Sequence, residues 1–136
     1  MLRIFTKPGK RVPLHSAGTG KVLLAYQQPR VVQTITERTG LEPVTANTIT
    51  DPDELSKVLL RVRSQGYAID MKEQEEGVCC LAAPVFTPDG QILAAISISG
   101  PTNRLTRGRL AELVPHVKSV ADALSRTINS VDATST

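Results

Sequence analysis

Cysteine is scarce in this chain of 136 residues, and its placement excludes two kinds of structural support. The two cysteines, Cys79 and Cys80, are neighbours in a stretch with the pattern of a β-strand. Adjacent strand residues point to opposite faces, so these thiols cannot form a disulfide with each other. The two histidines, His15 and His116, have no acidic or thiol residue at ligand spacing around them. We therefore expect no disulfide framework and no metal site.

Aromatic residues make up only 3% of the sequence, and tryptophan is absent. Proteins that bind single-stranded nucleic acids stack bases on aromatic side chains, and this sequence lacks such a platform. The formal net charge is +3, but the basic residues are dispersed instead of forming a stripe. Direct binding of nucleic acid by this chain is therefore the less favoured interpretation.

Long hydrophobic runs are also missing, since no stretch approaches the roughly 20 residues that a helix needs to cross a bilayer. The first residues lack the pattern of a signal peptide, because Lys7 and Lys10 are followed by polar positions. Hydrophobic residues (40%) and charged residues (21%) are present in the proportions of a globular domain. We expect one domain, residues 1–136, in the cytoplasm and without membrane contact.

Residues 66–101 carry the strongest pattern, which predicts three antiparallel strands joined by two short turns. Pro88-Asp89-Gly90 separates two apolar runs and is typical of a hairpin, because proline restricts φ and glycine adopts positive φ. The runs at 78–86 and 91–99 should therefore pair. Strand side chains alternate between faces. In the second run, one face carries Ala95, Ser97 and Ser99, and the other carries Ala94, Ile96 and Ile98.

The face that carries Ser97 and Ser99 combines small side chains with hydroxyl groups, and we interpret it as a pocket floor. By the same alternation, Val78 and Cys80 share a face of the neighbouring strand. Asp70 leaves its strand on the side opposite the apolar residues and is expected to face the same space. The alternative, which residue types alone favour, is that the serines hydrogen-bond locally and that Asp70 is a surface carboxylate.

Residues 16–25 predict a small-residue loop that opens an apolar helix. Backbone N–H groups near Gly18 and Thr19 are suited to hold a carboxylate at such a helix start. Equally, the glycines let the helix pack closely against its neighbours. A phosphate-binding loop is excluded, because it requires glycine where His15 stands and serine or threonine where Val22 stands. No cofactor is expected.

Three further amphipathic helices are expected. One begins at Pro29 and ends at Gly40, and the next is capped by Asp51 and closed by Gly66. A long helix follows residue 105, is kinked near Pro115, and should cover the sheet face that bears Ile96 and Ile98.

The chain ends complete the expected fold. Residues 1–6 predict a further strand, and residues 129–136 predict a frayed, disordered tail. The fold class is α+β: an antiparallel sheet of about four strands with helices on one side and a pocket-forming loop and helix on the other. One edge of this sheet is bare, so we expect another part of the natural protein or a second subunit to cover it.

Three blocks of this sequence resemble the effector-binding domain of the IclR family of bacterial transcription regulators. They are RVPLHSAGTGKVLLA at 11–25, GYAID with Gly77 and Cys80 at 66–80, and LAAPVFTPDGQILAAISISGP at 81–101. The resemblance implies a GAF-like or profilin-like domain that binds a small, usually carboxylate-bearing metabolite. It also implies that occupancy is passed to a winged helix-turn-helix domain ahead of this one.

Carried over position by position, the resemblance assigns the effector site to Gly18, Thr19, Asp70, Val78, Cys80, Ser97 and Ser99. It implies a small organic acid effector, a homodimer or homotetramer, and contact with DNA only through the winged-helix domain. These 136 residues lack that domain and the first helix and strands of the effector domain. Met71 and Lys72 stand where the family often has acidic residues, which bears on the identity of the effector.

Two alternatives belong to other functional classes. The chain is a self-association module without a ligand, or it is an enzyme that uses Cys80 as nucleophile with His15 or Asp70 as helper. Because a mid-strand cysteine is more often a small core residue, we do not expect an enzyme.

Overall fold

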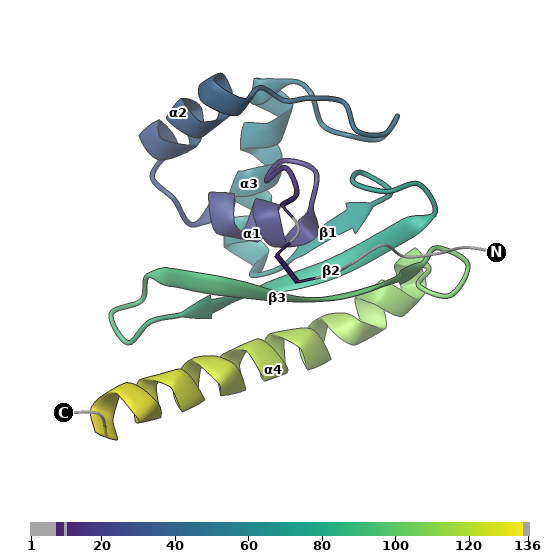
Figure 1. Ribbon diagram of the computed structural model, residues 1–136. Coiled ribbons are helices and arrows are strands. Elements are labelled where there is room, and N and C mark those ends of the chain that lie inside the picture. Colours follow the sequence, from purple (N-terminus) through teal and green to yellow (C-terminus); the bar gives the residue numbers. More distant parts are fainter. Residues whose placement is uncertain (1–7, 10, 135–136) are drawn as a thin grey trace.

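The computed structural model describes residues 8–9 and 11–134 and has the expected α+β class. The elements follow in the order α1 (Gly18–Ala25), α2 (Pro29–Thr39), α3 (Pro52–Gln65), β1 (Ala68–Met71), β2 (Val78–Phe86), β3 (Ile92–Pro101) and α4 (Arg107–Thr134). The antiparallel sheet lies between α4 on one face and α1, α2 and α3 on the other (Figure 1). The strand predicted at residues 1–6 lies outside the described residues.

The sheet has the order β1-β2-β3, and both pairs of strands are antiparallel, as predicted. The turn between β2 and β3 is closed by the N–H of Gly90, which donates to the carbonyl of Thr87 at 2.9 Å. Gly90 has a φ of 81°, which supplies the positive φ that the predicted hairpin requires. Within the described residues β3 is an outer strand, because it pairs only with β2.

Helix α4 covers the sheet face that bears Ile96 and Ile98, which confirms that prediction (Figure 1). The core of this layer contains alternate residues of β2 and one stripe of α4: Cys79, Leu81, Ala83, Val85, Leu110, Val117 and Ala121. Helix α4 runs through Pro115 and continues to Thr134. The backbone of residues 129–134, predicted as a tail, is therefore helical, since no glycine or proline in this stretch ends the helix.

The opposite face of the sheet is covered first by α1, beside which α3 packs, while α2 is outermost (Figure 1). Helix α3 has the predicted ends, because the carboxylate of Asp51 accepts from the N–H of Asp53 and Gly66 is left-handed. Lys118 of α4 donates to the carbonyl of Gln65 at 3.0 Å and so connects the two layers. The second core contains Val22, Leu24, Ala25, Ile49, Leu55, Leu59, Val62, Ala68 and Ala82.

Candidate functional site

A row of polar side chains crosses the whole sheet beneath α1. Asp70 of β1 pairs with Cys80 of β2, and Cys80 pairs with Ser99 of β3. Opposite residues of antiparallel strands project from the same face, and neighbouring strands lie about 4.8 Å apart. A carboxyl, a thiol and a hydroxyl group are therefore aligned across roughly 10 Å of sheet.

The neighbouring rows carry the other predicted residues of the sheet. Ser97 pairs with Ala82, and Ala82 pairs with Ala68, so Ser97 lies next to Ser99 on the same face. Val78 is two residues from Cys80 along β2 and shares this face as well. The predicted residues of all three strands therefore converge on one side of the sheet.

Helix α1 begins directly over this row. A Cβ atom on Gly18 would lie 2.7 Å from Sγ of Cys80 and 3.7 Å from Cβ of Asp70. The shorter distance is below the contact distance of nonbonded atoms, so only glycine lets α1 approach the sheet this closely. Gly20 is equally restricted, because its Cβ would lie 2.2 Å from the carbonyl oxygen of Leu14. The close-packing interpretation of these glycines is confirmed.

The first N–H group of α1, that of Gly18, points toward the same row. Ala17 is the N-cap residue and has no side chain that accepts from the first turn. The N–H of Gly18 instead donates to the thiol of Cys80, which also hydrogen-bonds the hydroxyl of Ser99. Thr19 is half-buried in the first turn. Gly18, Cys80 and Ser99 are thus in direct contact, and Thr19 follows Gly18 in the same turn.

The chemistry of Cys80 disfavours the enzyme alternative. Burial raises the pKa of its thiol to about 11, and the negative charge of Asp70 adds to this effect. The hydrogen bonds from Ser99 and Gly18 and the charge of Lys21 oppose the shift without cancelling it. The thiol is therefore protonated near neutral pH, whereas a cysteine nucleophile reacts as a thiolate.

Asp70 is 5% exposed, so the alternative that it is a surface carboxylate is wrong. Its Oδ1 atom accepts from the N–H of Glu73 at 2.7 Å. Burial raises the pKa of Asp70 to about 6, and the nearby carboxylate of Glu73 adds to the shift. The N–H groups of Glu73 and Gln74 and the ammonium of Lys21 act in the opposite direction. Asp70 therefore changes its charge close to neutral pH.

The predicted site residues differ in their exposure to solvent. Gly18, Asp70, Val78 and Cys80 are buried, whereas both serines are exposed. A hollow of about 750 Å³ lies between α2 and α3, and none of the predicted site residues lines it. Smaller hollows adjoin residues 12–15 and the outer side of α4. On the serine face beside α1, Ser97 and Ser99 are exposed and Ala95 is half-buried.

Sequence reasoning missed Lys21, which is 2% exposed in the first turn of α1. Its Nζ atom donates to the carbonyl of Ile69 and to Oε2 of Glu73, both at 2.6 Å. An available signal was that Lys21 is the one charged residue in a helix of apolar and small residues. A charge on such a buried face requires a partner, and the acidic run at 73–76 supplies one.

The segment between β1 and β2, residues 72–77, is held against the site by polar contacts. Thr48 donates its hydroxyl to the carbonyl of Glu73 at 2.6 Å, and Thr45 donates to that of Lys72 at 2.5 Å. The hydroxyl of Ser16 donates to the side-chain oxygen of Gln74. Lys72 has a φ of 62°, an uncommon value for a residue with a side chain. Contacts from residues 16–48 therefore fix the backbone beside Asp70.

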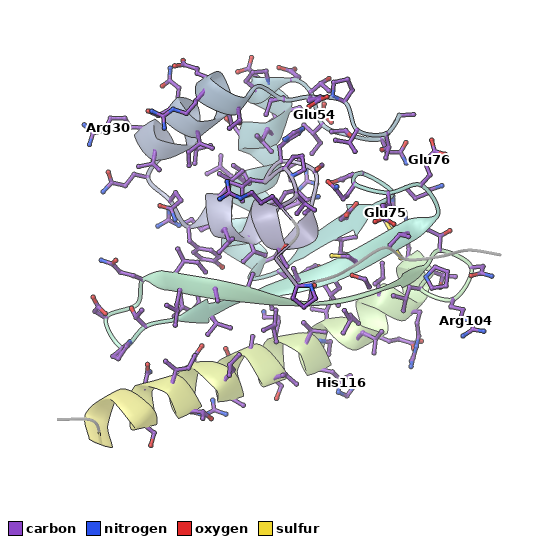
Figure 2. The ribbon with its side chains drawn as sticks, in the orientation of Figure 1. Arg30, Glu54, Glu75, Glu76, Arg104 and His116 are labelled. Atoms are coloured by element: carbon purple, nitrogen blue, oxygen red, sulfur yellow. The ribbon has the colours of Figure 1, made fainter. Side chains whose placement is uncertain are left out.

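The histidines do not contribute to this site. His116 projects from the side of α4 that faces away from the sheet (Figure 2). The ring of His15 is hydrogen-bonded through Nε2 to the carbonyl of Glu42 at 2.8 Å. Over residues 8–9 and 11–134, no cluster of histidine, cysteine and acidic residues has the composition of a metal site. In the same part of the chain, no helix combines the length and apolarity that crossing a membrane requires.

Comparison with known proteins relates this chain to a protein family. Residues 1–126 match the family described as bacterial transcriptional regulator IclR C-terminal. The chain is 43% identical over 124 residues to the HTH-type transcriptional regulator KdgR of Escherichia coli strain K12, covering 91% of this chain and 47% of KdgR. It is 40% identical over 124 residues to the HTH-type transcriptional regulator BhcR of Paracoccus denitrificans, covering 91% of this chain and 44% of BhcR.

A solved structure extends the comparison to a protein with a bound ligand. It is a double mutant of the inducer-binding domain of the PobR transcription factor from Acinetobacter, in complex with 3-hydroxybenzoic acid. The TM-score is 0.83 at 34% sequence identity, covering 86% of this chain and 69% of that chain. The chain spans less than half the length of the curated relatives KdgR and BhcR. It belongs to the IclR family of bacterial transcriptional regulators and corresponds to their C-terminal region.

Proposed function

We propose that this protein senses a small organic acid and that occupancy of its site controls DNA binding by a separate winged-helix domain. The observation that carries the proposal is the row formed by Asp70, Cys80 and Ser99 directly beneath the start of α1. Hydroxyl groups, an acid and helix N–H groups converge there on one face of the sheet. The hydroxyl and N–H groups among them are hydrogen-bond donors that suit a ligand with a carboxylate.

In this proposal the hydroxyls of Ser97 and Ser99 donate to the effector carboxylate, together with N–H groups at Gly18 and Thr19. The effector then replaces the thiol of Cys80 as the acceptor for Ser99 and Gly18. The serines are exposed and so accessible to a ligand, and the positive end of α1 favours an anion. Val78 and Cys80 contribute the apolar wall of the site. The 3-hydroxybenzoic acid bound by the related PobR domain is an organic acid of this class.

The proposed sensor acts in the cytoplasm as a homodimer or homotetramer and contacts DNA only through its winged-helix domain. Support comes from the relatives, which are named as HTH-type transcriptional regulators and are about twice as long as this chain. A self-association module without a ligand is the second candidate. It is favoured by β3, which is an outer strand of the sheet that the described residues form and carries the exposed Ser97 and Ser99.

Calorimetric titration with short keto acids and aromatic acids, including pyruvate and 3-hydroxybenzoate, tests the proposal. Hydrogen bonds to a charged group contribute about 1.5–3 kcal/mol each. We therefore expect Ser97→Ala with Ser99→Ala to weaken binding at least tenfold. The matched control is Ser64→Ala with Ser119→Ala, because both serines are exposed and lie on α3 and α4 away from the row.

Two results would contradict the assignment. Binding that is equally strong in both double variants would place the carboxylate elsewhere on the protein. Absence of binding heat for every acid, with an association that depends on β3, would favour the self-association module.

A further inference from the structure

Three ionisable side chains meet under α1, and their charges do not balance. Lys21 is 2% exposed, Asp70 is 5% exposed, and the side chain of Glu73 is 14% exposed. The ammonium of Lys21 forms an ion pair with Oε2 of Glu73 at 2.6 Å and donates a hydrogen bond to the carbonyl of Ile69. Asp70 accepts its hydrogen bonds from backbone N–H groups and is not the ion-pair partner of Lys21. The ammonium group of Lys21 is therefore already paired with the carboxylate of Glu73.

The groups that face Asp70 from each neighbouring element fix the total charge. Helix α1 contributes Lys21, the segment 72–77 contributes Glu73, and β2 contributes the thiol of Cys80, while the thiol of Cys79 lies on the opposite face of the sheet. Both thiols have raised pKa values because of burial and because of the charge on Asp70, so they are neutral. The cluster is electrically neutral when Asp70 is protonated and carries one negative charge when Asp70 is ionised.

We propose that Asp70 takes up one proton when an organic acid binds beside it, because Lys21 is already neutralised by Glu73. The inference rests on the proposed function and concerns the same site. The effector arrives as a carboxylate, the proton comes from solvent, and the carboxylate of Asp70 becomes a carboxylic acid. The new O–H group then donates a hydrogen bond to the effector, and no other covalent bond forms or breaks.

The physical reason is the repulsion between the buried carboxylate of Asp70 and an effector carboxylate held at the start of α1, on the same face of the sheet. A nearby like charge raises the pKa of a carboxyl group, as it does in pairs of neighbouring acids. The pKa of Asp70 is already raised to about 6 by burial before any ligand binds. A second negative charge next to Cys80 and Gly18 raises it further. At pH 7.5 the free protein is therefore largely ionised at Asp70, and the complex is largely protonated there.

The sign of the pH dependence follows from linkage. A ligand that raises the pKa of a group binds more tightly where that group is protonated. Affinity for the acid is therefore greatest below the pKa of free Asp70 and is lost as pH rises through about 6. With one linked proton, the dissociation constant increases about tenfold for each pH unit between the pKa of free Asp70 and its higher pKa in the complex.

Calorimetry of the protein at pH 7.5 in phosphate and in Tris measures proton uptake directly, because these buffers differ in ionisation enthalpy. The probes are pyruvate and 3-hydroxybenzoate. We expect the binding heat to differ between buffers by the amount that corresponds to nearly one proton per bound acid. Asp70→Asn should bind without proton uptake, since an amide donates a hydrogen bond but does not titrate.

Asp122→Asn is the matched control, because Asp122 is exposed on α4 across the sheet and should leave proton uptake unchanged. Glu73→Gln is a second variant that does not alter Asp70 itself. It releases Lys21 to neutralise Asp70, so proton uptake should fall below that of the natural protein.

Three outcomes would overturn the inference. Binding heats that do not depend on the buffer would show that no proton is taken up, while leaving the sensor proposal intact. Uptake that persists in Asp70→Asn would place the proton on another group. Absence of heat with either acid would contradict the sensor proposal itself and remove the proton linkage with it.

Discussion

At the scale of single residues, Gly18 determines how close α1 comes to the sheet. Its Cβ position lies 2.7 Å from Sγ of Cys80, so a methyl group there must displace the thiol or the helix. Gly108 is also helical, but nothing lies within 4 Å of its Cβ position. The two glycines therefore differ in their surroundings and not in their helical setting.

We predict that Gly18→Ala lowers the free energy of unfolding by about 1–3 kcal/mol through overpacking. Gly108→Ala should instead be neutral or stabilising by up to about 1 kcal/mol, because alanine favours a helix. Urea denaturation of the two variants makes the comparison, and adding Cys80→Ala should recover part of the loss at Gly18. Equal stability of the two single variants would disprove the tight contact.

The residue scale also shows what sequence reasoning can and cannot supply. Strand alternation predicted that Ser97 and Ser99 share a face of their strand and that Val78 and Cys80 share a face of theirs, since the period of two depends only on the local backbone. The family resemblance assigned these residues and Asp70 to one site. Neither predicted that Asp70 is buried while the serines are exposed. Burial depends on which elements cover each strand, and that is a property of tertiary packing.

At the scale of elements, the ion pair of Lys21 with Glu73 joins α1 to the segment that follows β1. Its partners are 52 residues apart in the chain, so no local pattern could have paired them. The same holds for the bond from Thr48 to the carbonyl of Glu73. Polar contacts between distant segments are thus the part of the site that the sequence left undetermined.

We predict that Lys21→Met costs about 3 kcal/mol of stability, because it leaves the carboxylate of Glu73 without its partner. The matched control is Arg109→Met, which removes the exposed pair with Glu112 on α4 and should cost less than about 1 kcal/mol. Thermal and urea denaturation of both variants measure the difference.

A double variant, Lys21→Met with Glu73→Met, completes the test of this ion pair. Replacing both partners with apolar side chains removes the unpaired charge, so most of the lost stability should return. If Lys21→Met is no more damaging than Arg109→Met, the pair does not connect the two elements.

At the scale of the whole molecule, the sheet separates two helical layers that contact it in different ways. Helix α4 covers one face with a continuous apolar core, while α1 meets the other face through glycines and polar groups (Figure 1). The long amphipathic helix and the hairpin were predictable because each has a strong periodic signal. The location of the hollow between α2 and α3 was not, since it depends on how these two helices pack.

That hollow is also the main competitor of the proposed site, and NMR chemical-shift mapping separates the two. Pyruvate or 3-hydroxybenzoate is titrated into the isotope-labelled protein, and the backbone amide signals are followed. We predict that the shifts concentrate at Gly18, Thr19, Cys80, Ser97 and Ser99. Shifts confined to α2 and α3 around the hollow, with an unchanged row beneath α1, would contradict the account.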